Sequence, residues 1–149
     1  MLHSHIRIWI HLIWATKNHI RVFDKDTSQK LALHMINKAK DEKVPFISLN
    51  IQPEHAHGLI NLPSDICLAD FMQKIKGESS FWLNQEVMQS RRLSEYKFAW
   101  QRGYGAYSVS VSQLEVVKNY IRNQDSHHKR TTFMEEYEEW KNEYGFIDD

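Results

Sequence analysis

Two histidines lie two residues apart in the stretch QPEHAHGLINLP, which runs from residue 52 to residue 63. The composition of residues 55–62 predicts a β-strand, and alternate side chains of a strand lie on the same face. His55 and His57 therefore point the same way, at a spacing that suits two ligands of one divalent metal ion. The chain has nine histidines, so a chance pair with a structural role stays open.

A second pair of polar side chains lies in the later stretch EVVKNYIRNQ. Ser112 followed by Glu115 has the pattern of a capping box and predicts a helix from Ser112 to about Arg130. Tyr120 and Gln124 are four residues apart and share one face of that helix. A separate apolar stripe can anchor the helix, and it consists of Leu114, Val117 and Ile121. This pair alone also fits an ordinary amphipathic helix.

Together the two pairs have a coherent chemistry. Two imidazoles and one amide oxygen are neutral ligands, so a bound divalent ion keeps its full charge, polarises a phosphodiester and stabilises charge in the transition state. A tyrosine with a pKa of about 10 is a poor nucleophile at neutral pH, and a nearby cation helps it. Attack by Tyr120 on DNA leaves a phosphotyrosyl bond of similar energy, which allows rejoining without ATP.

The pattern along the chain predicts one α+β domain over residues 1–149, without repeats or linkers. Its order, β-α-β-β-α-β followed by helices, is that of a ferredoxin-like or RRM-like split βαβ sandwich. In that fold an antiparallel sheet carries helices on one face, here with an added C-terminal catalytic helix. The expected elements are a strand through Ile6, Ile8, Ile10 and Leu12, a helix over 24–43, strands over 46–51 and 55–62, a helix over 66–87, a strand within FAWQRGYGAYSVSVS, the Ser112 helix, and a helix from Thr132, capped with Glu135, to about Glu143.

The composition is that of a globular protein, with 42% hydrophobic and 26% charged residues. A single cysteine, Cys67, cannot form an internal disulfide. No signal peptide or membrane span is visible in the sequence, so a cytoplasmic protein without a membrane partner is expected. The formal net charge is zero, but the last 15 residues hold seven acids and one lysine, which leaves residues 1–134 with six more basic than acidic side chains. That surplus is compatible with phosphate binding.

The order and spacing of these motifs resemble the single-tyrosine HUH transposases, the insertion-sequence-200-like family of the smallest bacterial insertion sequences. PEHAHGLI and YIRNQ carry the resemblance, which extends over nearly the whole chain. IHLIWATKNHIRVF is similar to the family's first strand and loop, FMQKIKGESSFWLN to its second helix, and WQRGYGAYSVSVSQ to the segment that enters the catalytic helix.

The resemblance implies that Tyr120 is the nucleophile, cutting single-stranded DNA and holding its 5′ phosphate. His55, His57 and Gln124 would bind Mg²⁺ or Mn²⁺, and imidazole ligands favour Mn²⁺. The family acts on DNA hairpins near element ends and works as a homodimer, in which the tyrosine helix of one subunit can complete the other subunit's site. Charge and position alone suggest six phosphate contacts, Lys74, Lys76, Arg91, Arg92, Arg102 and Arg122.

Other functions stay open at this point. One is a non-catalytic nucleic-acid-binding module of RRM-like fold, and another is a metal-dependent hydrolase in which Tyr120 is structural. Within the family, a domesticated transposase acting on repetitive palindromes is a further alternative. That group usually carries asparagine where this chain has Gln124, which favours the insertion-sequence branch. A covalent DNA–protein adduct would separate a transposase from the binding module and the hydrolase.

Overall fold

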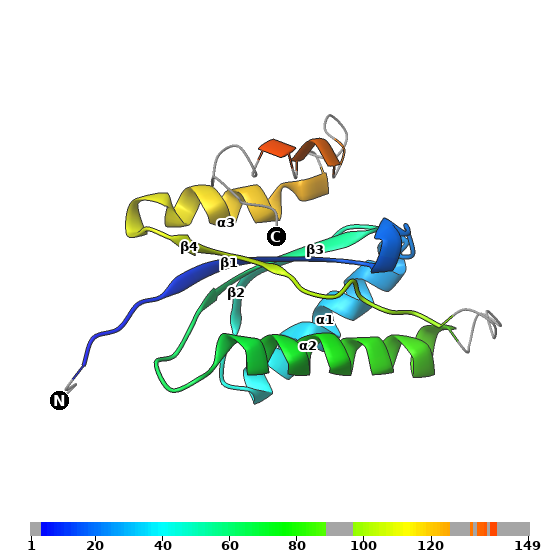
Figure 1. Cartoon of the computed structure of the whole chain (residues 1–149), viewed down its shortest axis with the longest axis horizontal. Helices are drawn as coiled ribbons and strands as arrows, with labels where there is room; N and C mark the ends of the chain where they lie inside the picture. Colours follow the sequence, from blue (N-terminus) through cyan, green and yellow to red (C-terminus); the bar gives the residue numbers. More distant parts are fainter. Residues whose placement is uncertain (1–3, 89–96, 126–131, 133, 137, 140–149) are drawn as a thin grey trace.

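A computed structural model describes residues 4–88, 97–125, 132, 134–136 and 138–139. Four strands form one antiparallel sheet in the order β2-β3-β1-β4. Helices α1 and α2 cover one face of the sheet, and α3 lies on the other (Figure 1). This is the predicted split βαβ arrangement with an added helix. The elements are β1 (Trp9–Ala15), the 3₁₀ turn η1 (Lys17–His19), α1 (Lys25–Asp41), β2 (Phe46–Ile51), β3 (His55–Asn61), α2 (Leu68–Trp82), the π-helical turn η2 (Leu83–Met88), β4 (Gly105–Val109), the 3₁₀ turn η3 (Val111–Gln113) and α3 (Leu114–Arg122).

The two faces of the sheet have separate apolar clusters. On the α1 and α2 side, Leu12 and Trp14 of β1 pack with the predicted α1 stripe of Leu31, Met35 and Ala39. On the α3 side, a smaller cluster joins Leu59, Val109 and Ile121. Strand β1 lies between β3 and β4 and is covered on both faces, so every residue from 10 to 15 is buried. This explains why its sequence is apolar without a clean alternation.

The first strand begins later than its alternation predicted. Ile6 and Ile8 are exposed, and β1 starts at Trp9, where it pairs with Asn61 of β3 and Val109 of β4. The last residues of β3 and β4 therefore determine where β1 starts.

Side-chain capping was predicted at two helices, with different outcomes. Ser112 does not cap α3, because its Oγ lies 3.1 Å from Ser110 Oγ and the chain forms the η3 turn before the helix starts at Leu114. The predicted capping box at Ser112 is wrong. Thr132 does cap the next helical turn, since its Oγ1 accepts the backbone N–H of Glu135 at 3.2 Å. Helix α3 ends at Arg122 with a turn at Asn123, so the prediction of one continuous helix to about Arg130 is wrong; the predicted end near Glu143 lies outside the described residues.

Within the described part of the chain, none of the helices has the length and hydropathy that crossing a bilayer requires.

Candidate active site

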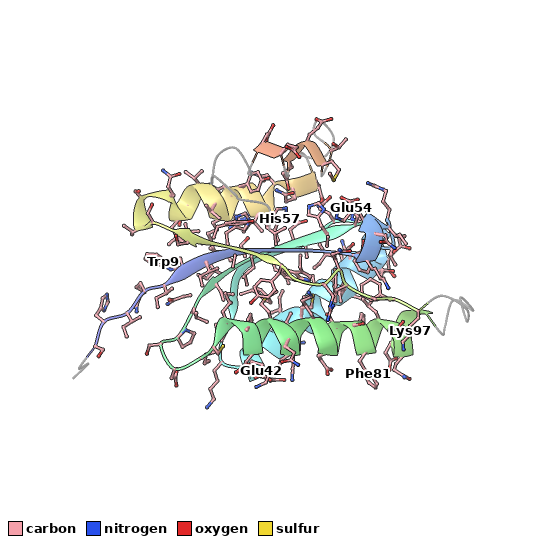
Figure 2. The ribbon with its side chains drawn as sticks, viewed as in Figure 1. Trp9, Glu42, Glu54, His57, Phe81 and Lys97 are labelled. Carbon is pink, nitrogen blue, oxygen red and sulfur yellow. The ribbon has the colours of Figure 1, made fainter. Side chains whose placement is uncertain are left out.

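The two histidines of β3 lie on the face of the sheet that α3 covers. Figure 2 shows His57 between the sheet and α3. The alternation of β3 predicted a shared face, and the structure places both rings there, with the Nε2 atoms of His55 and His57 3.1 Å apart. Both side chains are fully buried. Ala56 and Gly58 point to the opposite face, where Ala56 joins the larger core cluster.

His55 is oriented by a carboxylate on the side away from His57. Its Nδ1 lies 2.8 Å from Glu54 Oε1, and the other oxygen of Glu54 accepts a 2.8 Å hydrogen bond from Arg21 Nη1. Burial lowers the pKa of His55 below its usual value, although the Glu54 carboxylate acts in the opposite direction. A neutral imidazole held by a carboxylate at Nδ1 is a common arrangement for metal-binding histidines.

His57 has two close neighbours that the sequence did not predict. Its Nδ1 lies 3.1 Å from Nε2 of His11, and its Nε2 lies 3.0 Å from Oε1 of Glu136. Glu136 Oε1 is also 3.8 Å from His55 Nε2. One ligand atom from each of His55, His57 and Glu136 falls within a group 4.8 Å across, and all three residues are buried. The segment after α3 therefore brings a carboxylate to the histidine pair.

Helix α3 brings the tyrosine and the amide to the same place. The ring of Tyr120 lies 5.7 Å from that of His57, centroid to centroid, with the planes at 87°. The helix ends at Arg122 and the chain turns at Asn123, and the side chain of Gln124, which follows this turn, is fully buried. Gln124 Nε2 donates to the backbone carbonyl of Tyr120 at 3.2 Å, and the Gln124 side chain contributes to the pKa values of His55 and of the Tyr120 phenol. All four residues predicted to form the site thus lie together.

The site is electrostatically unusual because a partly buried phenol, whose oxygen is shielded from solvent, interacts with a buried carboxylate. Burial, together with the hydrogen bond to Glu136 and its charge, raises the pKa of Tyr120 well above its usual value. Burial also raises the pKa of Glu136 to about 7. Without added positive charge, Tyr120 is therefore fully protonated at neutral pH.

Comparison with known proteins identifies the family to which the chain belongs. A family model for IS200-like transposases matches residues 4–124, a span that contains the histidine pair, the tyrosine and the glutamine. The chain belongs to the IS200-like transposase family. The match covers most of the chain, and it indicates an activity that cuts and rejoins DNA.

Relatives of this IS200-like transposase include the ISDra2 transposase TnpA of Deinococcus radiodurans, which is 23% identical over 114 residues, covering 76% of this chain and 81% of that protein. A protein from the same organism, described as a transposase, has a crystal structure with a similar fold and a TM-score of 0.67. The two sequences are 22% identical, and the match covers 83% of this chain and 95% of that chain. The structure of a REP-associated tyrosine transposase bound to a REP hairpin gives a TM-score of 0.57, with 16% identity over 86% of this chain and 73% of that one.

Two of the predicted DNA contacts of this transposase lie on α2, across the sheet from the site. Lys74 Nζ lies 3.1 Å from Glu42 Oε2, and Figure 2 shows Glu42 on the far side of the sheet from His57. Lys76 Nζ donates to the backbone carbonyls of Gln101 at 2.9 Å and Gly103 at 2.7 Å. Their role in DNA binding stays a prediction, but both already have structural partners.

Of the other four predicted contacts, two can be located. Arg122 is exposed at the end of α3. Arg102 lines a cavity of about 330 Å³ together with His19, Tyr104 and Tyr107, beside β1 and β4. Arg91 and Arg92 lie outside the described residues.

Three residues of the site were missed by sequence reasoning. Glu54 directly precedes the histidine pair, and an acid beside an H-x-H pattern was the available signal. His11 was hidden in an apolar strand, and Glu136 in the acidic C-terminal segment. Neither had a local signal, because each reaches the site only through tertiary structure.

Proposed function

We propose that this chain is a metal-dependent single-stranded DNA transposase that cuts and rejoins DNA through a 5′-phosphotyrosine intermediate on Tyr120. The observation that supports this most directly is the placement of the Tyr120 phenol in one buried cluster with His55, His57 and Gln124. A non-catalytic binding module would have no need for a buried nucleophile beside a pair of converging imidazoles.

The donor set fits a divalent cation. Octahedral ligands about 2.1 Å from Mg²⁺ are about 3.0 Å from their nearest neighbours, and the two Nε2 atoms are 3.1 Å apart. We assign His55, His57 and Gln124 as the ligands, with Mn²⁺ or Mg²⁺ as the ion. The Glu136 carboxylate lies in the same group of atoms, so a cation there also offsets its buried negative charge.

Each side chain then has a defined task. A bound divalent cation supplies positive charge that favours the phenolate and stabilises charge on the scissile phosphate. The oxygen of Tyr120 forms the new bond to phosphorus, and the bond from phosphorus to the 3′ oxygen breaks, with that oxygen taking up a proton from solvent. Glu136 accepts the phenol proton, because its carboxylate lies in the same buried cluster as the Tyr120 phenol and interacts with it.

The proposed substrate is a single strand beside a DNA hairpin, as the family resemblance implied. The REP-associated relative was solved with a REP hairpin bound, which supports a structured DNA partner for this chain as well. The predicted homodimer stays part of the proposal, and size-exclusion chromatography with light scattering tests it. Within this single chain, Tyr120 already lies against His57.

A covalent-adduct assay tests the proposal. Oligonucleotides from the DNA flanking the gene, labelled at either end, are incubated with protein and Mn²⁺ and separated on a denaturing gel. A 5′-phosphotyrosyl bond predicts that the 3′ label migrates with the protein, while the 5′ label appears on a shorter free strand. Tyr120→Phe and His57→Ala should abolish both products. Tyr104→Phe is the matched control, because Tyr104 is exposed and should leave the reaction unchanged.

Two results would contradict the proposal. Tight DNA binding without any adduct would favour the binding module. Cleavage without an adduct, retained in Tyr120→Phe, would favour a metal-dependent hydrolase.

A further inference from the structure

His11 is a buried polar residue that the proposed reaction does not use directly. It lies on β1, with 2% of its surface exposed. Strand pairing places its neighbour Ile13 opposite His57, so His11 lies diagonally next to His57 on the same face of the sheet. The two imidazole rings stack, with centroids 5.3 Å apart and planes at 24°. His11 Nε2 lies 3.1 Å from His57 Nδ1.

The direction of the His57 ring determines which nitrogen faces the other candidate ligands. Its Nε2 lies 3.1 Å from His55 Nε2 and 3.0 Å from Glu136 Oε1, whereas its Nδ1 faces His11. A neutral imidazole carries one proton, and the nitrogen that binds a metal must be the unprotonated one. If His57 binds the metal through Nε2, its proton must be on Nδ1, and a hydrogen-bond acceptor must lie opposite Nδ1.

We infer that His11 is a positioning residue whose Nε2 accepts the Nδ1–H of His57, fixing the tautomer and ring orientation in which His57 presents its Nε2 lone pair to the metal. The inference rests on the proposed function, since it concerns the same site. Two ring nitrogens 3.1 Å apart form a hydrogen bond only when one carries the proton and the other accepts it.

The two candidate metal ligands on β3 then differ in what holds them. His55 faces the Glu54 carboxylate, which is itself paired with Arg21. A carboxylate at this position makes the imidazole more basic and therefore a stronger metal ligand. His57 faces a neutral imidazole, which fixes its geometry without adding charge. A second carboxylate at position 11 would add to the negative charge of Glu136 in a buried site. A neutral acceptor avoids that cost.

Two substitutions at position 11 separate the hydrogen bond from packing. His11→Phe keeps a planar ring of similar size but removes the acceptor. His11→Gln restores an acceptor, because a glutamine side chain reaches the place of Nε2. His34→Phe is the matched control, since His34 lies on α1 and stacks on Trp82, across the sheet from the site. Thermal unfolding of each variant checks that it is folded.

The first measurement is the ¹⁵N spectrum of the imidazoles in wild-type protein with saturating Mg²⁺. We expect His57 as the Nδ1–H tautomer with a hydrogen bond to His11. An Nε2–H tautomer for His57 under these conditions would overturn the inference without any variant.

The second measurement is Mn²⁺ affinity by titration calorimetry. Removing a residue that orients a ligand typically weakens metal binding by about 10- to 100-fold, which we expect for His11→Phe, with His11→Gln within about threefold of wild type. Wild-type affinity in His11→Phe would overturn the inference and leave the proposed function intact. Wild-type protein that binds no Mn²⁺ would overturn both.

Discussion

The buried carboxylate of Glu136 should make the stability of the protein fall as pH rises. Burial raises its pKa from 4.5 to about 7 in the folded chain. Below pH 4.5 the carboxyl is protonated in both states, and between 4.5 and 7 the unfolded chain releases a proton that the folded chain keeps. The free energy of unfolding therefore decreases through this window. The shift corresponds to about 3 kcal/mol at about 1.4 kcal/mol per pKa unit.

Glu136→Gln isolates this contribution, because an amide has a similar shape and does not ionise. Urea unfolding is measured in EDTA at several values between about pH 4 and about pH 8, a range that spans both pKa values. Relative to Glu136→Gln, wild-type protein should lose about 3 kcal/mol across the range. Glu138→Gln, which changes an exposed acid two residues away, should follow the wild-type curve. Parallel curves for wild type and Glu136→Gln would refute the buried-carboxylate reasoning.

The same substitution separates two roles for Glu136 in the reaction. An amide oxygen can still lie beside a metal ion, but it cannot take the phenol proton. Mn²⁺ binding should therefore persist in Glu136→Gln, while adduct formation slows by about 10²- to 10⁴-fold, the usual contribution of a general base. Adduct formation at the wild-type rate would rule out Glu136 as the proton acceptor.

Three further substitutions test the framework around the site, each measured by urea unfolding. Gly58→Ala places a methyl group 2.7 Å from Cε1 of Phe46 and should cost about 1–3 kcal/mol, whereas unchanged stability would mean that the ring moves freely. Asp24→Ala removes the oxygen that caps α1 with a 2.8 Å hydrogen bond and should cost about 1 kcal/mol; Asp24→Asn is its conservative control. Lys76→Met removes hydrogen bonds of 2.9 and 2.7 Å to the loop after residue 100 and should cost about 1 kcal/mol; no loss would show that these bonds are exchanged for water at no cost.

Some expectations failed for local reasons. The Ser112 capping box had a favourable sequence pattern, but Ser110 offers Ser112 a nearer partner, and the chain takes a 3₁₀ turn first. The alternation from Ile6 to Leu12 extended the first strand too far, because its neighbours pair only from Trp9 onward. In both cases the sequence pattern was compatible with more than one arrangement of hydrogen bonds.

The sequence by itself determined the features that depend on local geometry. Strand alternation put His55 and His57 on one face, because this periodicity follows from the backbone within a few residues. Helical spacing predicted that Tyr120 and Gln124 lie together, and they do, although α3 ends at Arg122. The order of elements and the motif spacing also predicted the fold and the family, and both are confirmed.

Only the tertiary structure decided which residues surround the histidine pair. His11 is 46 residues from His57 in the chain and reaches it through β1–β3 pairing. Glu136 is 79 residues away, and its carboxylate lies 3.0 Å from the His57 ring. Neither residue has a sequence pattern that distinguishes it from an ordinary strand or surface residue. Contacts at such separations depend on how whole elements pack, so the surroundings of the metal ligands could be identified only in the folded chain.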